Sequence, residues 1–150
     1  HTLTHPNLDQ ESPPQVDAEL RGGDRALSAL VANTSAAAIM RPPHGRYTEA
    51  TVQTALNDGY GVILWNDDPG DFRSGVTPQQ LAEHMLRHAS APDIILLHSG
   101  HLATVEALPG VVKAFRSAGF RFVTVGELLR SVPWEKINHP AKVSLGGGSS

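Results

Sequence analysis

The chain has 150 residues, of which 40% are hydrophobic and 18% are charged, with a formal net charge of −3 and no cysteine. This length and composition indicate about one soluble globular domain. The small negative charge gives no reason to expect nucleic acid or an anionic membrane as a partner, no apolar run approaches the roughly 18 residues of a membrane helix, and disulfides and thiolate sites are excluded.

The first feature in chain order is a pair of histidines, His1 and His5, followed at once by Pro6. Two histidines at positions i and i+4 can bind one metal ion if the step is roughly one helical turn, and imidazole suits zinc. Proline disfavours the α region for the residue before it, so we expect the pair in a short helical turn or loop. Taken alone, the two histidines could equally be solvated or the remnant of a tag.

Hydrophobic periodicity and cap residues predict alternating helices and strands in the rest of the chain. After a polar loop at 7–15, the expected helices are 16–32, 48–58, 77–90, 109–118 and 126–131, and the expected strands are 36–40, 61–65, 93–98 and 120–125. Gly22–Gly23 should weaken or break the first helix, and Thr48 and Thr77 should cap the second and third. This alternation predicts an α/β fold with a parallel sheet. Residues 132–150 are expected to form a tail or linker.

Side chains that can take part in catalysis or ligand binding follow the expected strands. Arg41 follows the first strand, the acidic segment 65–71 follows the second, and His98 ends the third. Loops at the carboxyl ends of parallel strands open on one face, where the active sites of parallel sheets and barrels lie. We therefore expect one functional site at this edge.

Each of these residues also has a structural explanation. His98 could cap a buried strand, and Asp68 and Asp71 could be turn residues in an Asp-Asp-Pro-Gly segment. Arg41 could be the ion-pair partner of one of these aspartates. His101 is interpreted as a loop residue and only a weak ligand candidate. The remaining discounted histidines are two on the expected solvated side of a helix and one in the tail, namely His84, His88 and His139.

Four motifs stand in order along the chain: His1-Thr2-Leu3-Thr4-His5, Arg41-Pro42-Pro43-His44-Gly45, Asp68-Pro69-Gly70-Asp71-Phe72 and Leu96-Leu97-His98. As a set they resemble the motifs of the polysaccharide deacetylases of the NodB-homology group, carbohydrate esterase family 4, over about residues 1–130. Phe72 stands where that family has tryptophan. The family's first motif, Thr-Phe-Asp-Asp-Gly, is not found in this sequence.

The resemblance implies a partial or distorted (β/α) barrel in residues 1–131, with the first strand or strands absent. In the family, the first motif holds the general base and a third metal ligand. The hypothesis is therefore an incomplete chain, with a preceding segment or a second chain that supplies the two aspartates.

The resemblance also implies a role for each candidate residue. His1 and His5 would bind a divalent metal, with zinc expected and cobalt or nickel as alternatives. His98 would be the general acid, oriented by Asp71. The other implied roles are orientation of the base by Arg41, oxyanion binding by the backbone N–H of His44, and pocket lining by Trp65, Phe72 and Leu96.

The implied reaction is removal of N-acetyl groups from a glycan such as peptidoglycan or chitin oligomers, with release of acetate. An O-acetyl xylan esterase, a catalytically inactive glycan-binding relative, and an unrelated metal hydrolase that uses His98 and His101 as ligands are the alternatives. Family resemblance places the protein outside the cytoplasm: secreted, periplasmic or at the cell surface.

Overall fold

A computed structural model describes residues 1–31 and 39–132. The chain divides into two compact units, residues 1–64 and residues 65–150, and each is described by itself. The elements in chain order are η1 (Leu8–Gln10), α1 (Pro13–Leu30), β1 (Ile39–Met40), η2 (Pro43–Gly45), α2 (Glu49–Asn57), β2 (Gly61–Val62), α3 (Pro78–His88), α4 (Leu102–Ser117) and α5 (Val125–Ser131).

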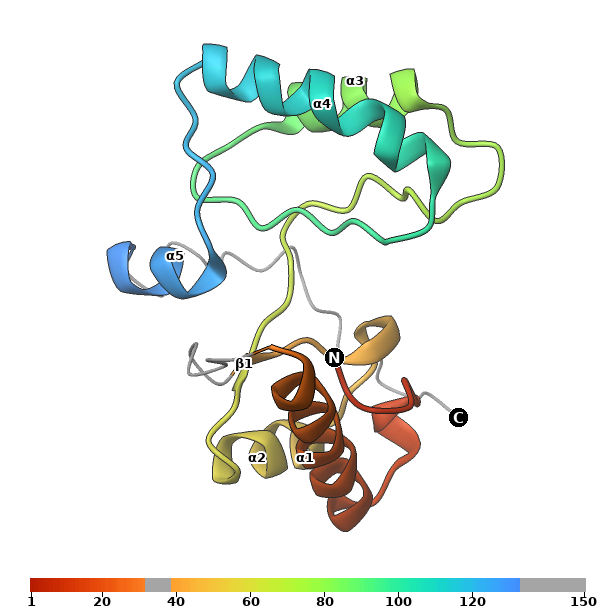
Figure 1. Cartoon of the computed structure of the whole chain (residues 1–150), viewed down its shortest axis with the longest axis vertical. Coiled ribbons are helices and arrows are strands. Elements are labelled where there is room, and N and C mark those ends of the chain that lie inside the picture. Colours follow the sequence, from red (N-terminus) through yellow and green to blue (C-terminus); the bar gives the residue numbers. More distant parts are fainter. Residues whose placement is uncertain (32–38, 133–150) are drawn as a thin grey trace, which may run out of the picture. The chain divides into compact units, whose positions relative to one another are not determined.

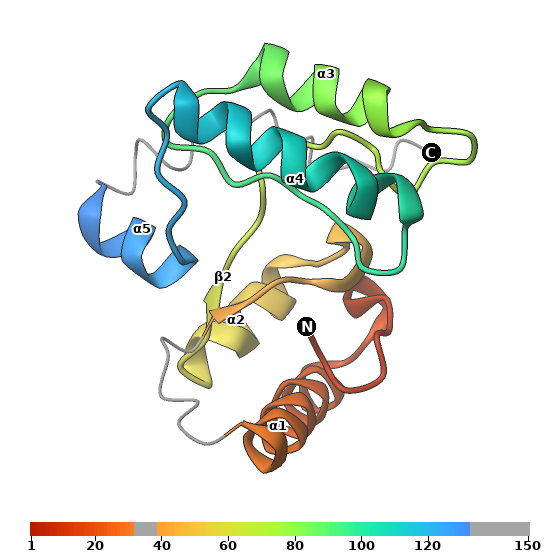
Figure 2. The same cartoon turned by 45° about the horizontal axis from the view of Figure 1, so that its top comes forward.

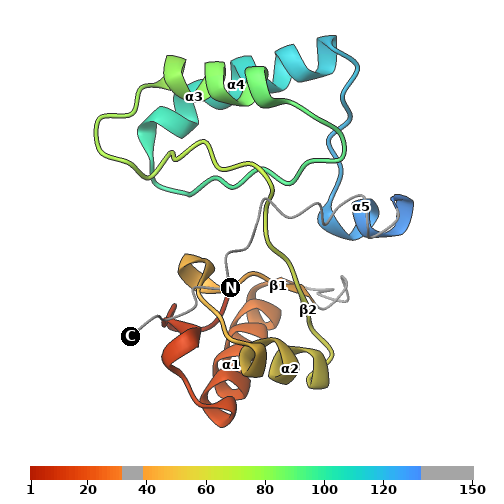
Figure 3. The ribbon, with the colours of Figure 1, turned by 180° about the vertical axis from the view of Figure 1, so that it is seen from behind.

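The first unit is built on two helices and a short pair of strands. Helices α1 and α2 lie side by side, as Figures 1 and 3 show. Strands β1 and β2 pair in parallel, with Ile39 opposite Gly61 and Met40 opposite Val62. The parallel pairing that the alternation of elements predicted is therefore confirmed for these strands. The core of the unit consists of Leu8, Val16, Leu20, Met40 and Ala55.

Helix α1 runs without a break through Gly22–Gly23, so the expected interruption there is wrong. A capping box of Ser12 and Gln15 starts the helix, and it begins earlier than the periodicity predicted because Pro13 is well tolerated in a first turn. The helix tolerates its glycines because another segment packs closely on them. A Cβ atom added to Gly23 would lie 2.9 Å from the carbonyl oxygen of Thr2.

The second unit contains α3 and α4, which also lie side by side (Figures 1 and 2). Their facing sides form a core of Leu81, Met85, Ala107, Val111 and Phe115. Thr77 caps α3 as predicted: its hydroxyl accepts a hydrogen bond from the backbone N–H of Gln80. Thr48 caps α2 in the same way, through the N–H of Thr51.

Three boundaries in the second unit differ from those expected. Helix α4 begins at Leu102, not at Pro109, because its buried stripe continues on both sides of the proline, which lies on the exposed face. The expected strand 93–98 is reduced to a single parallel bridge between Asp67 and Ile95. The expected strand 120–125 is extended chain that ends where α5 begins. A strand needs a pairing partner, and none lies beside that segment in the described ranges.

Two of the sequence predictions lie mostly outside the described residues. Positions 36–38 of the first expected strand and positions 133–150 of the expected tail belong to this group. Within the ranges 1–31 and 39–132, no helix has the length and apolar character needed to cross a membrane.

Candidate active site

The two histidines of the first motif converge on each other in the first unit. Their Nε2 atoms lie 3.1 Å apart, and the rings meet edge to face with centroids 4.8 Å apart. His1 Nδ1 lies 2.6 Å from the backbone carbonyl oxygen of Arg41. Because a carbonyl oxygen can only accept, Nδ1 carries the proton, and a neutral His1 presents a lone pair on Nε2. That tautomer and that carbonyl partner are typical of histidines that bind metals.

The segment that carries this pair is an irregular turn and not a helical one. Thr2 and His5 both have positive φ, at 61° and 63°, which places them in the left-handed region. The expectation that Pro6 would exclude His5 from the right-handed α region is confirmed. The Thr2 hydroxyl accepts a hydrogen bond of 3.1 Å from the backbone N–H of His5, which closes the turn.

The second motif lies beside the histidine pair in the same unit. The exposed ring of His44 packs edge to face on His5, with centroids 4.6 Å apart. His44 has φ 56°, and its backbone N–H donates to no acceptor in the described part of the chain. Burial lowers the pKa of the Arg41 guanidinium, and in residues 1–31 and 39–132 no carboxylate lies within 4 Å of it. Among the described residues, the loop thus offers an N–H without an acceptor and a partly buried cation without a carboxylate partner.

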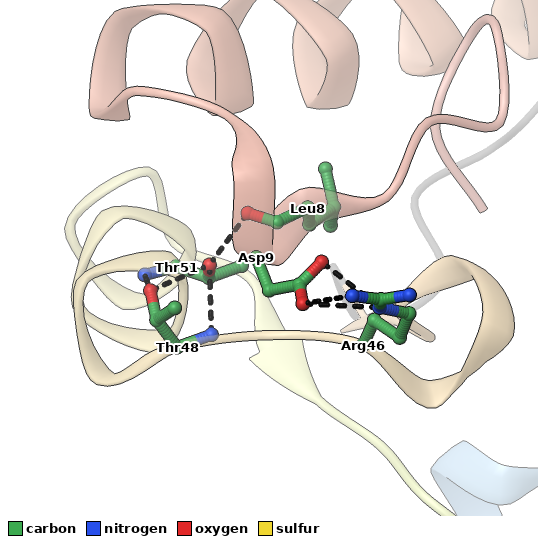
Figure 4. Close-up of polar contacts among 5 residues, drawn as sticks. All are labelled: Leu8, Asp9, Arg46, Thr48 and Thr51. Atoms are coloured by element: carbon green, nitrogen blue, oxygen red, sulfur yellow. Dashed lines mark hydrogen bonds and ion pairs between the residues drawn. The ribbon is translucent and has the colours of Figure 1, made fainter. Parts of the chain in front are cut away.

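A polar network holds this loop next to the chain that follows the histidine turn (Figure 4). The Arg46 guanidinium binds both carboxylate oxygens of Asp9, at 2.8 to 3.1 Å. The buried Thr51 hydroxyl donates to the carbonyl oxygen of Leu8 at 3.1 Å and also completes the capping box of Thr48. Leu8 and Asp9 stand three and four residues after His5, so the network restrains the first motif relative to the second.

The second unit contains a buried carboxylate paired with a histidine. His98 Nδ1 lies 2.7 Å from Asp71 Oδ1, and the backbone N–H of His98 donates to Asp71 Oδ2 at 2.7 Å. The Asp71 side chain is fully buried, whereas about a third of the His98 side chain is exposed. Burial opposes ionisation of Asp71, but the hydrogen bonds from His98 and Thr104 outweigh it and lower the pKa of Asp71. The pair therefore presents an oriented imidazole backed by a carboxylate.

Thr104 is a member of this site that the sequence did not single out. Its hydroxyl donates to Asp71 Oδ2 at 2.8 Å, from the first turn of α4, and the residue is buried. A threonine inside an apolar helix carries no distinguishing pattern. Only its position in space, against a buried carboxylate, reveals the contact.

The predicted pocket residues occupy different surroundings. The ring of Phe72 is half exposed and meets the His98 ring edge to face, with centroids 5.4 Å apart. Leu96 is buried, two residues before His98. Trp65 is half-buried, and no ring contact or hydrogen bond joins it to His98 in the described ranges. Phe72 is therefore the pocket candidate that contacts the acid–carboxylate pair.

The prediction that His84 lies on the solvated side of its helix is wrong. His84 Nε2 lies 2.8 Å from Asp67 Oδ1, and the His84 side chain is two-thirds buried. A helical wheel does not include the loop that covers that face of α3. His88 is exposed as expected, with its ring 4.6 Å from that of His84. His101 precedes α4 as its N-cap, and its ring centroid lies 6.2 Å from that of His98.

Known proteins resemble this chain both in sequence and in structure. The family profile described as polysaccharide deacetylase matches residues 1–63. A peptidoglycan-N-acetylglucosamine deacetylase from Bacillus cereus is 32% identical over 136 residues, which cover 87% of this chain and 62% of the relative. The chain resembles the polysaccharide deacetylase family in sequence and in structure. The family resemblance inferred from the four motifs is thereby confirmed.

Two further relatives define the extent of the match. A chitooligosaccharide deacetylase from Sinorhizobium fredii is 30% identical over 134 residues, which cover 89% of this chain and 58% of the relative. The crystal structure of a carbohydrate esterase family 4 pseudoenzyme from Bacillus anthracis has a TM-score of 0.78 and 25% identity, and the match covers 85% of this chain and 44% of that one. The chain thus spans less than two thirds of the length of these relatives. Its described elements are part of a (β/α) barrel of the NodB type.

Members of this family are generally metal-dependent, so the histidine pair can be tested against a metal. Two imidazole nitrogens bound tetrahedrally to zinc at about 2.0–2.1 Å lie about 3.3 Å apart. The observed separation of 3.1 Å between the Nε2 atoms of His1 and His5 fits two ligand positions. In residues 1–31 and 39–132, no group of three or more histidine, cysteine or acidic residues could hold an ion. A catalytic zinc site usually has three protein ligands, and the histidine pair could supply two of them.

Proposed function

We propose that this protein takes part in metal-dependent hydrolysis of N-acetyl groups on a polysaccharide, such as peptidoglycan or chitin oligomers, with release of acetate. The observation that carries the proposal is the pairing of His98 with the buried Asp71 carboxylate through two hydrogen bonds of 2.7 Å. Substrates of this kind lie outside the cytoplasm, which supports a secreted, periplasmic or cell-surface protein.

His98 has the arrangement that a general acid requires. Its Nδ1–H donates to Asp71, so Nε2 is the atom that can transfer a proton. The carboxylate fixes the ring orientation and balances the positive charge of the protonated ring. We assign to His98 the protonation of the leaving amine nitrogen, and to Asp71 the orientation of His98.

The first unit supplies the groups that act on the acetyl carbonyl. His1 and His5 would hold the metal, taken to be zinc, which when bound polarises the carbonyl and makes a water more acidic. The backbone N–H of His44, which has no acceptor among residues 1–31 and 39–132, is suited to the oxyanion that forms at that carbonyl. The Arg41 guanidinium, partly buried and without a carboxylate partner in the described ranges, is suited to orienting an acidic base.

A second candidate is a glycan-binding relative without turnover. The specific observation that favours it is the structural similarity to the Bacillus anthracis pseudoenzyme. Such a protein would retain the glycan-contacting Phe72 and the metal-binding pair without a base.

Metal analysis and acetate release, measured together, separate the two candidates. Full-length protein would be incubated with N-acetylglucosamine oligomers and with peptidoglycan, with zinc and after treatment with a chelator. Acetate release that is lost on chelation and restored by zinc supports the deacetylase. Bound metal and retained glycan binding without acetate release would support the second candidate.

A further inference from the structure

The Glu19 carboxylate of helix α1 is hydrogen-bonded to the histidine turn. Glu19 Oε2 accepts hydrogen bonds from the backbone N–H groups of Leu3 at 2.9 Å and Thr4 at 2.8 Å. Glu19 Oε1 accepts a third, of 2.7 Å, from the Thr4 hydroxyl. Figure 2 shows the N-terminal segment beside this helix. One side chain, fifteen residues away in sequence, thus binds both central residues of the turn.

Two glycines on the same face of α1 allow the turn to approach. Gly22 and Gly23 stand three and four residues after Glu19, which places all three on one side of the helix. A Cβ atom at Gly22 would lie 2.9 Å from the flexible end of Leu3. A Cβ atom at Gly23 would lie 2.9 Å from the carbonyl oxygen of Thr2 and 3.0 Å from its carbon, and backbone atoms cannot yield as a side chain can.

The turn requires this support because its backbone is unfavourable. Thr2 and His5, at the two ends of the contacted segment, both have positive φ, which residues with a Cβ atom seldom adopt and a β-branched threonine disfavours most. If the turn relaxed, the Nε2 atoms of His1 and His5 would no longer converge. The metal affinity of a site decreases in proportion to the fraction of molecules that are in the binding-competent conformation.

We propose that Glu19 is a positioning residue that holds His1 and His5 in their metal-binding geometry. The close packing at Gly22 and Gly23 supports the same turn. This inference rests on the proposed function, since it takes the two histidines as metal ligands. Both Glu19 oxygens are engaged by donors of the turn, so Glu19 acts through the backbone of the turn and not as a ligand. The general acid His98 and its partner Asp71 are not involved.

Zinc affinity tests the role of the carboxylate. Calorimetric titration of the full-length protein with zinc should give an affinity about 10- to 100-fold weaker for Glu19→Ala than for wild type, the usual loss when a residue supporting a metal ligand is removed. Glu19→Gln keeps the volume and neutral hydrogen bonds, so it should lose less affinity than Glu19→Ala. The matched control is Asp17→Asn, which removes a carboxylate of the same helix that binds Arg21 and not the turn.

Two variants, each with one glycine replaced by alanine, test the packing independently. Gly23→Ala should weaken zinc binding about tenfold or more because its methyl group displaces the backbone of Thr2. The control Gly110→Ala adds a methyl group to another helical glycine, in α4, where no atom lies within 4 Å, and should leave the affinity unchanged. Circular dichroism at the titration temperature identifies any variant that is not folded.

Amide hydrogen exchange provides a measurement that needs neither metal nor activity. The amides of Leu3 and Thr4 should be protected in the wild type and in Asp17→Asn, and should lose protection in Glu19→Ala. Equal zinc affinity for folded Glu19→Ala and wild type would overturn the role of Glu19 but would leave the proposed metal site intact. Equal losses in Glu19→Gln and Glu19→Ala would overturn it too, because a charge effect would be indicated. Zinc binding that is undetectable in wild type and in His5→Ala alike would overturn the proposed metal function itself, and with it this role of Glu19.

Discussion

His98 and the carboxylate of Asp71 share two hydrogen bonds, one from the ring Nδ1 and one from the backbone N–H of His98, each 2.7 Å long. The double contact fixes both the position of the histidine backbone and the direction of its ring. A side chain restrained in this way loses little entropy when it reaches a transition state. The Thr104 hydroxyl is a third donor to the same carboxylate.

Replacement of Thr104 by valine should destabilise the protein and slow the reaction without removing a catalytic group. Valine has nearly the same shape but cannot donate to Asp71 Oδ2. Loss of a hydrogen bond to a buried charge costs about 1–3 kcal/mol of unfolding free energy. Chemical denaturation measures that cost, and Thr104→Ser, which retains a hydroxyl, should recover most of it. A fully stable Thr104→Val protein would show that the hydroxyl does not support Asp71.

Replacement of Asp71 by asparagine should change how stability depends on pH. The pKa of Asp71 is lowered from its ordinary value of 3.8 in the folded protein. A lowered pKa contributes stability that is present above about pH 4 and is lost as the pH falls through the folded value. Wild type should therefore exceed Asp71→Asn in stability at pH 7, by about 2 kcal/mol, and the difference should shrink below pH 4.

Denaturation with urea between pH 2.5 and pH 7 checks this prediction. The control is Glu83→Gln, which alters an exposed pair with Arg87 in α3 and should give a small difference. A difference between wild type and Asp71→Asn that grew as the pH fell would contradict a lowered pKa for Asp71.

The two contacts that hold the His44 loop should contribute unequally to the free energy of unfolding. The Arg46–Asp9 pair is substantially exposed, so a double-mutant cycle with alanine should give a coupling of about 0.5 kcal/mol, decreasing with added salt. Thr51 is buried, and Thr51→Val should cost about 1–2 kcal/mol because the carbonyl oxygen of Leu8 loses its donor. A larger effect at Arg46 than at Thr51 would mean that the ion pair is the main restraint on the loop.

His84 and His88 provide a matched pair on one helix. His84→Leu should destabilise the protein by about 1–2 kcal/mol, because Asp67 would lose its partner while its other oxygen is already buried without a hydrogen bond in the described ranges. His88→Leu, at an exposed position, should change stability by less than about 0.5 kcal/mol. Thermal or urea denaturation of the two variants is sufficient, and equal effects would contradict an important His84–Asp67 contact.

Local features of this fold could be predicted from the sequence because their causes are local. Thr48 and Thr77 bond to backbone groups three residues away, so their caps can be recognised in a short window. Pairing of strands depends on distant segments, and two of the expected strands are therefore shorter here than their apolar runs, while the one at 120–125 is absent. The start of α4 predicted at Pro109 is wrong, because a proline on an exposed face does not interrupt a helix whose buried stripe continues.

Some residues of the candidate site could likewise be predicted from the sequence, and others could not. His98 and Asp71 could be found from their motifs, and the structure pairs them. Glu19 and Thr104 could not be found, because each acts through hydrogen bonds between segments far apart in sequence. Gly22–Gly23 was visible as an anomaly in a helix, but its explanation lies in the turn that packs on it.

The rate of acetate release by His98→Ala tests whether His98 is the proton donor of a metal-dependent deacetylase. Full-length protein with N-acetylglucosamine oligomers should lose nearly all activity, by a factor of about 10² to 10⁴, while it retains its zinc and its fold. His88→Ala is the control and should keep the wild-type rate. Acetate release at the wild-type rate by His98→Ala, or loss of the metal together with activity, would contradict the account.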